Sequence, residues 1–275
     1  MKIKSYKNTY SYSKLNSYKS CPQKFKIIYI DKIRNQNEGI EAFMGKRVHE
    51  VLEWLYLDPE INKKFISFDS IMAKYNELWN DKWHDSIFMA KCKFDKTFYN
   101  KKTLYDIGVD CLGNYYRNFN LNGIFNQNVY KIELGFQCTV GSNVFRGFID
   151  RIDVDDKGVI DVIDYKTGKK SKTIYNAKND FQLAIYYKAV MDLFPDFQKI
   201  RLNFYNLREK KKDKMVIQAE YDEKKLNKII KNINDVVYDI NHEEDFIAKE
   251  SLLCEWCYYW DDCEVKASQN PAIRL

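Results

Sequence analysis

The stretch that decides the fold runs from residue 144 to residue 166 and reads VFRGFIDRIDVDDKGVIDVIDYK. It holds two runs rich in β-branched and aromatic residues, separated by Asp156-Lys157-Gly158. This tripeptide is typical of a three-residue hairpin loop with glycine in the left-handed position. The sequence therefore predicts an antiparallel hairpin with strands over 144–154 and 159–165, in which Asp155 pairs with Val159.

The register of this hairpin brings two carboxylates together. Counting from the Asp155–Val159 pair places Asp150 directly opposite Asp164, and Lys166 projects from the same face. Opposed carboxylates repel each other unless a cation lies between them, and oxygen ligands favour Mg²⁺ or Mn²⁺. A solvated hairpin face with one incidental salt bridge is the alternative. We favour the metal site because the strand of Asp164 is apolar on both faces, where an unpaired carboxylate is costly.

The composition is that of a folded globular protein. The 275 residues are 45% hydrophobic and carry 45 Lys+Arg against 39 Asp+Glu, a net charge of +6. This charge permits a nucleic-acid partner without requiring one. No apolar run is long enough to span a bilayer and the first residues have no signal-peptide core, so we expect no membrane partner and a cytoplasmic protein. In such a reducing compartment the seven cysteines favour metal binding over disulfides.

Hydrophobic periodicity predicts a mixed α/β fold with a mostly helical first half. Helices are expected over 13–30 (two short helices hinged at Cys21-Pro22), 42–56, 68–88, 102–119, 177–193 and 223–241. Strands are expected over 129–140, 144–154, 159–165, 200–207 and 215–221.

Five segments carry motifs that agree with one family in their order along the chain. They are Ser11-Tyr12-Ser13-Lys14-Leu15 with Tyr18, Cys21-Pro22 and Phe25; Gly45-Lys46-Arg47-Val48-His49-Glu50; Gly147-Phe148-Ile149-Asp150-Arg151-Ile152-Asp153; Val162-Ile163-Asp164-Tyr165-Lys166-Thr167-Gly168; and Gln182-Leu183-Ala184-Ile185-Tyr186. Together they resemble the PD-(D/E)xK nuclease superfamily, and specifically its RecB-like branch with a C-terminal iron–sulfur cluster. Ile149 departs from the proline that names the superfamily.

The resemblance implies a restriction-endonuclease-like core, with a central mixed sheet flanked by helices. We expect a single nuclease domain over 1–275. Within it we distinguish N-terminal helices (1–56), a helical insertion (57–128), the nuclease core (129–241) and a cysteine-bearing tail (242–275).

The resemblance also assigns roles in a catalytic site. It implies that His49, Asp150 and Asp164 hold the catalytic metal with the backbone carbonyl of Tyr165, and that Lys166 serves the attacking water. From the residues alone, a helix histidine satisfied by a neighbour is the better explanation of His49, and only the G-x-x-x-H-E setting favours the metal role.

Two further residues of the implied site lie on a helix. Gln182 and Tyr186 lie one helical turn apart, so they can reach the active site or the DNA backbone together. Polar positions on an amphipathic helix are the alternative.

Four other charged residues are weaker candidates. Counting across Gly141-Ser142-Asn143 as a three-residue loop puts Glu133 opposite Arg151, so we favour a structural ion pair over a further acidic group of the site. Lys169, Lys170 and Lys172 follow the second carboxylate strand and would contact DNA phosphates, unless they are a solvated charge run.

The cysteines form a pattern across the two ends of the chain. Cys254, Cys257 and Cys263 lie in the tail, and Cys21 lies near the other end. Four thiolates bind zinc or an iron–sulfur cluster and would join the N-terminal helices to the tail. The spacing resembles the 4Fe–4S cluster of AddB-type nucleases, which we favour over structural Zn²⁺. Cys92, Cys111 and Cys138 lie in apolar patterns typical of buried free thiols.

The leading functional hypothesis is a Mg²⁺- or Mn²⁺-dependent DNA exonuclease. It would act on single-stranded DNA or DNA ends in repair, recombination, or phage or CRISPR DNA processing. The alternative is a non-autonomous DNA-binding or scaffold subunit of a helicase–nuclease or spacer-acquisition complex, although an intact set of acidic residues and lysine counts against it. No G-x4-G-K-S/T loop occurs, so a helicase, like CRISPR integration proteins, would be a separate partner.

Overall fold

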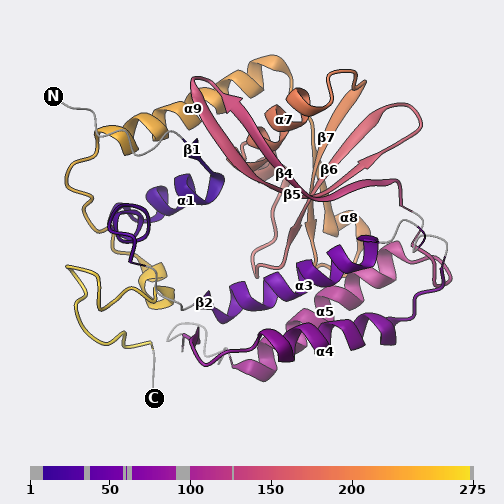
Figure 1. Cartoon of the computed structure of the whole chain (residues 1–275), viewed down its shortest axis with the longest axis horizontal. Coiled ribbons are helices and arrows are strands. Elements are labelled where there is room, and N and C mark those ends of the chain that lie inside the picture. The colour runs from indigo at the N-terminus through magenta and orange to yellow at the C-terminus, as the bar shows by residue number, and fades with distance from the viewer. Residues whose placement is uncertain are drawn as a thin grey trace.

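The protein is described by a computed structural model that covers residues 9–33, 38–57, 60, 64–90, 100–125 and 127–272 (Figure 1). Its elements, in chain order, are β1 (Thr9–Tyr10), α1 (Tyr12–Ser20), α2 (Pro22–Phe25), a π-helical turn (Lys26–Ile30), β2 (Glu38–Gly39), α3 (Ile40–Leu57), α4 (Phe68–Lys82), β3 (Ile87–Phe88), α5 (Lys101–Phe119), β4 (Val129–Val140), β5 (Asn143–Val154), β6 (Val159–Lys166), α6 (Ile174–Ala177), α7 (Phe181–Leu193), β7 (Lys199–Asn206), α8 (Lys212–Met215), β8 (Val216–Ala219), α9 (Glu223–His242) and a 3₁₀ turn (Leu252–Trp256).

A six-stranded mixed sheet forms the centre, in the order β1-β5-β6-β7-β8 with β4 paired to β5. The β5–β6 and β7–β8 pairs are antiparallel, whereas β6 and β7 are parallel. Figure 1 shows α3, α4 and α5 gathered on one side of this sheet and α7 and α9 on the other. The predicted mixed α/β class, a central sheet flanked by helices, is confirmed; the finer division into segments stays a prediction.

Alternation along the strands produces two hydrophobic cores. Val162 packs into the core beneath α7 and α9, and its neighbour Ile163 packs into the core beneath α3, α4 and α5. Both side chains are fully buried. Strand β6 is therefore apolar on both faces, as its sequence predicts.

Two predicted helices have different bounds in the structure. Asp180 accepts hydrogen bonds from the backbone N–H groups of Gln182 (2.8 Å) and Leu183 (3.3 Å), so α7 begins there and the predicted 177–193 helix is separate from α6. The predicted 68–88 helix ends at Lys82, and Ile87–Phe88 pairs with β2 instead.

The decisive hairpin has the predicted register. Arg151 pairs with Ile163 and Val154 with Ile160, and Asp155 N–H donates to Val159 O at 3.1 Å. Gly158 has φ +73°, the left-handed conformation expected of the loop.

The preceding hairpin differs from the prediction by one residue. Its loop is Gly141-Ser142, because Val140 pairs directly with Asn143. Gly141, at φ +63°, permits a tight two-residue turn that starts with glycine. Arg151 therefore faces Ile132, and the predicted Glu133–Arg151 ion pair is wrong. Glu133 lies between the Ile132–Arg151 and Leu134–Ile149 pairs, level with Asp150.

No helix among the described residues combines the length and apolarity needed to cross a membrane.

Candidate active site

Three elements bring potential metal ligands to one point on the sheet. His49 of α3, Glu133 of β4 and Asp150 of β5 each offer a ligand atom, and these atoms lie within 4.8 Å of one another. The His49 Nδ1 and Asp150 Oδ2 atoms are 3.5 Å apart. Helix α3 can approach this end of the sheet closely because a Cβ on Gly45 would lie only 2.8 Å from Thr167 Oγ1. Gly45 thus helps to set the position of His49 one turn later.

Glu133 occupies a strained backbone position beside these ligands. Its φ is +42°, which a residue with a Cβ adopts at a cost of roughly 1–2 kcal/mol. Burial, followed by the nearby Asp150, raises the pKa of its carboxyl to about 7. Sequence analysis placed it one residue out of register, and the only available signal was the alternative turn at Gly141.

Asp164 and Lys166 lie at the end of β6 beside this group. Asp164 is 2% exposed, and its Oδ2 lies 2.5 Å from Lys166 Nζ but accepts no hydrogen bond of good geometry. Burial raises the pKa of Asp164. Asp150 Oδ2 accepts the backbone N–H of Tyr165 at 2.8 Å, which ties β5 to β6 where the two acids meet.

Helix α7 closes the site from the other side. Lys166 Nζ donates to Gln182 Oε1 at 2.9 Å, and Gln182 Nε2 donates to Tyr186 OH at 2.8 Å. Tyr186 OH in turn lies 3.5 Å from Asp164 Oδ1. The predicted helical face of Gln182 and Tyr186 therefore meets Asp164 and Lys166 in one hydrogen-bonded ring.

This donor set fits a divalent cation that prefers oxygen. It offers carboxylates and one imidazole, and Oδ2 of the buried Asp164 has only the Lys166 ammonium, at 2.5 Å, beside it. Clustered carboxylates of this kind are costly without a compensating charge. The residues present thus suit Mg²⁺ or Mn²⁺. The Tyr165 carbonyl as a further ligand stays a prediction.

Arg151 supports the site from within the opposite core. It is fully buried, donates to Asp153 Oδ1 at 2.6 Å and to Tyr115 OH at 2.7 Å, and lies over the Tyr56 ring at 4.5 Å. A buried guanidinium with its donors satisfied resists displacement, because an unpaired one would be strongly unfavourable. Arg151 therefore holds the strand position next to Asp150.

Two basic loops flank the site at the carboxyl ends of the parallel strands β6 and β7. Of the predicted lysines, Lys170 is exposed, whereas Lys172 pairs with Asp180 at 3.2 Å. Lys169 is exposed as well. The second loop was not predicted, although the run Lys210-Lys211-Lys212 directly after a strand is a signal for it. The loops are joined because Arg208 Nε donates to Thr167 O at 2.7 Å.

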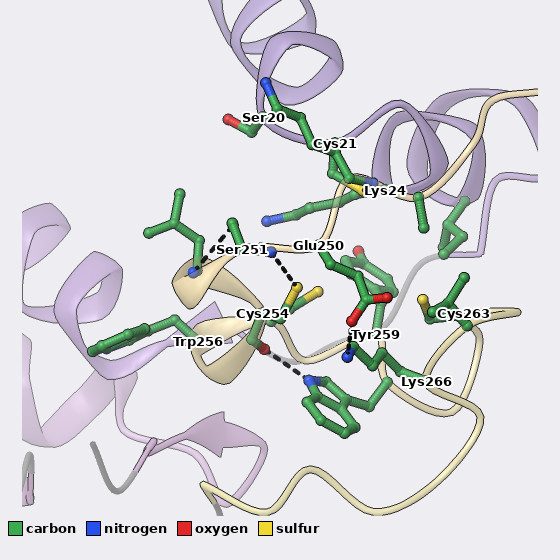
Figure 2. Close-up of a pocket in the computed structure, with 17 residues that line it drawn as sticks. Ser20, Cys21, Lys24, Glu250, Ser251, Cys254, Trp256, Tyr259, Cys263 and Lys266 are labelled. Carbon is green, nitrogen blue, oxygen red and sulfur yellow. Dashed lines mark hydrogen bonds and ion pairs between the residues drawn. The ribbon is translucent and has the colours of Figure 1, made fainter. Parts of the chain in front are cut away.

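The four predicted cluster cysteines meet at the far end of the molecule (Figure 2). Cys21 comes from the start of α2 and the others from the tail, and all four line one cavity of about 210 Å³. The backbone N–H groups of Lys249 and Ser251 point at the Cys21 and Cys254 sulfurs, each at 3.4 Å. Among the described residues, no three of these thiols lie within 4.8 Å of one another.

The other cysteines are simpler. Cys111 and Cys138 are buried free thiols, as predicted, and Cys92 lies outside the described residues.

We expect the Glu133→Gln variant to be more stable than the wild type without metal at pH 8, with a melting temperature a few degrees higher. The pKa of Glu133 is raised in the folded state, from 4.5 to about 7. The folded wild type therefore binds this proton more tightly than the unfolded chain, and stability is lost as the pH rises from about 4.5 through 7. Thermal melts in EDTA at pH 8 and pH 5 measure the difference, which should be much smaller at pH 5.

The control for this variant is Glu220→Gln, which changes a half-exposed glutamate paired with Lys199. It should leave the melting temperature within about 1–2 °C at both pH values. A metal-free Glu133→Gln protein that is less stable than the wild type at pH 8 would contradict the buried, repulsive environment of this carboxylate.

Comparisons with known proteins identify the superfamily. The model of the PD-(D/E)XK nuclease superfamily matches residues 9–264. Among solved structures, the "Putative exonuclease" of Eubacterium rectale superposes with a TM-score of 0.51 at 10% identity, covering 99% of this chain and 93% of its own. SSO0001 gives a TM-score of 0.36 at 15% identity, with 94% and 87% covered. No curated protein matches in sequence. Since the family model covers most of the chain, the protein belongs to the PD-(D/E)XK nuclease superfamily.

Proposed function

We propose that the protein is a Mg²⁺- or Mn²⁺-dependent DNA exonuclease of the RecB-like branch. The observation that carries this proposal is the convergence of His49, Glu133 and Asp150 beside the Asp164–Lys166 pair. A scaffold protein would have no reason to retain a strained glutamate and a buried carboxylate at one point. Processing of DNA ends in repair, recombination or CRISPR adaptation, with a helicase or integration protein as partner, is the setting that we propose.

The residues divide the chemistry of phosphodiester hydrolysis between them. His49, Glu133, Asp150 and Asp164 would hold the ion, which supplies Lewis acidity to the phosphate and a nucleophilic water. Burial alone would lower the pKa of Lys166, but Asp164 and Asp150 outweigh it and raise the pKa. The ammonium therefore offers a positive charge to the phosphate, and Gln182 holds its direction.

The four cysteines are proposed to hold a 4Fe–4S cluster. A zinc ion with Zn–S bonds of about 2.3 Å would draw its sulfurs to roughly 3.8 Å from one another. The cavity of about 210 Å³ and the wider spacing of the thiols suit a larger group. N–H groups directed at the sulfurs are the kind of contact that tunes such clusters.

The nuclease proposal is tested with anaerobically purified protein and DNA labelled at the 5′ or 3′ end, single- and double-stranded. We expect cleavage with Mg²⁺ or Mn²⁺ and none with EDTA, with short products released from one labelled end. Internal cleavage products seen with both end labels would show that the protein is an endonuclease and not an exonuclease. If cluster-containing protein cleaves no DNA with either metal, the proposal of an autonomous nuclease is contradicted and the scaffold subunit is favoured.

We expect the basic loop after β7 to bind the DNA backbone. The triple variant Lys210→Gln/Lys211→Gln/Lys214→Gln should lower affinity for DNA about tenfold at 100 mM salt, because each lost phosphate contact removes counterion release. The slope of log affinity against log salt should fall by roughly 2. Fluorescence anisotropy titrations at several salt concentrations measure both quantities.

The matched control removes three exposed lysines from α9, in Lys224→Gln/Lys228→Gln/Lys231→Gln. It changes the net charge equally but lies outside both loops. Equal losses in the two triple variants would show a general effect of charge and contradict a localised contact.

A further inference from the structure

A groove of about 790 Å³ begins beside the hydrogen-bonded ring that Gln182 and Tyr186 form with Asp164 and Lys166, and it runs away from this ring. Gln182 and Tyr186 line one end, residues 11–13 at the start of α1 form one wall, and residues 135–137 and 146–148 form the other. Phe136 lies at its floor and contacts the Tyr186 ring at 5.7 Å. The groove is thus continuous with the site that holds Asp164 and Lys166.

The groove exists because one edge of β5 lacks a partner over part of its length. Strand β1 pairs with β5 at Val144 and Phe145, and β6 pairs with it from Arg151 onward. Between these, residues 146–150 have no paired strand on that edge within the described chain. An extended ligand can therefore lie along β5 and reach the catalytic residues.

Strand β5 carries three different kinds of side chain at every second position. Asp150, Phe148 and Arg146 follow one another at intervals of two residues, roughly 7 Å, along the strand. Phe148 and Arg146 share the face opposite to the buried Phe145 and Ile149, and the alternation is interrupted at Asp150, because Ile149 and Ile152 pack into the same core. Read from the metal ligands outward, the row is a carboxylate, an aromatic ring and a cation.

Phe148 lies in this row as an open aromatic surface. The ring is 64% exposed, and it lies against Gly135, the residue that it faces on β4. A Cβ at Gly135 would lie 3.3 Å from the Phe148 ring, so the glycine makes room for the ring to rest on the strand. An exposed phenylalanine backed by a strand in this way offers its free face to a flat partner.

Arg146 supplies the charge at the outer end. It is exposed, and within the described part of the chain its guanidinium has no acidic partner. Lys14 is close enough that Arg146, after burial, lowers the pKa of its ammonium. Two neighbouring cations without a carboxylate between them form an attractive place for an anion such as a phosphate.

We propose that Phe148 stacks on the base next to the scissile phosphate of a single DNA strand and that Arg146 contacts a phosphate further along it. This inference rests on the proposed nuclease function and names the substrate strand at the same site. Stacking on an aromatic ring needs a base whose face is free, which a single strand offers and the interior of a duplex does not. Because every base has such a face, the contact would be tolerant of sequence.

Binding is tested in calcium, with a fluorescein-labelled oligothymidylate whose integrity is checked on a gel. We expect Phe148→Ala to weaken binding roughly five- to a hundredfold and Phe148→Trp to restore it, since each stacked base contributes through the ring alone. Arg146→Gln should reduce the slope of log affinity against log salt by about 1. The control Tyr130→Ala removes a 53% exposed aromatic on the same hairpin, outside the groove, and should bind within twofold of wild type.

Each other outcome decides against the proposal. Binding by Phe148→Ala within twofold of wild type, failure of Phe148→Trp to restore affinity, or an equal loss on a blunt duplex would overturn the proposal. A wild type that binds no single strand would overturn it as well. Since binding is measured without turnover, a wild type that binds as expected but never cleaves in Mg²⁺ or Mn²⁺ would overturn the nuclease and leave this strand contact standing.

Discussion

Asp150→Asn is expected to reduce metal-dependent DNA cleavage by roughly a thousandfold or more while the protein stays folded. Asparagine keeps the size of the side chain and an oxygen that can accept the Tyr165 N–H now bonded at 2.8 Å. It removes the negative charge of the Asp150 carboxylate, which lies beside His49 and Glu133 in the candidate metal site. A metal contributes several kcal/mol to transition-state stabilisation, and each 1.4 kcal/mol is about a factor of ten in rate. End-labelled DNA cleavage and metal-induced shifts in melting temperature measure the two losses.

The control for this variant is Asp161→Asn. Asp161 lies on β6 three residues before Asp164, but it pairs with Arg201 and Asn203 away from the site. Its loss should leave cleavage within about twofold of wild type, because a partly exposed ion pair contributes little beyond local stability. Cleavage by Asp150→Asn at a tenth of the wild-type rate or more would show that Asp150 does not hold the metal.

The pair of Asp150 and Asp164 could be predicted from sequence because both lie within one short hairpin. Asp156-Lys157-Gly158 specifies the loop, and the alternation of side chains then fixes the register with no further information. Glu133 could not be placed in the same way. Gly141 is compatible with a two- or a three-residue loop, and a shift of one residue moves Glu133 from Arg151 to Asp150.

Contacts between distant segments were out of reach of local patterns. Only the resemblance to a family linked His49 to the sheet, since no periodicity reports how closely α3 approaches Thr167. The split of the predicted 177–193 helix has a local cause instead, the N-cap of Asp180, which precedes Gln182 in the sequence and could have been read there. Phe148 illustrates a third case. It lies in the part of β5 between the pairing with β1 and the pairing with β6, and no local pattern shows where these two pairings stop.

Cys257→Ala is expected to remove the bound iron and to lower the melting temperature by about 10 °C or more. Apart from the 3₁₀ turn Leu252–Trp256, residues 243–272 contain no helix or strand, so the proposed cluster would contribute a large part of the order of the tail. A structural metal group contributes several kcal/mol to folding, and each kcal/mol corresponds to roughly 2–4 °C in a chain of this size. Metal analysis, thermal melts and limited trypsin digestion at Lys249 and Lys266 measure the change.

The loss should be confined to the tail and the helices that it holds. Phe246 stacks on Phe25 at 6.0 Å and Tyr18 OH donates to Glu243 at 2.9 Å, so the start of the tail keeps some attachment without the cluster. The control Cys111→Ala shortens a fully buried side chain of α5 outside the cavity, and it should cost only a few degrees with iron unchanged. Zinc in place of iron in the anaerobic wild type would retain the cross-link and exclude the cluster. Full metal content and unchanged stability in Cys257→Ala would exclude both, because a fourfold thiolate site cannot lose a ligand without a change in affinity.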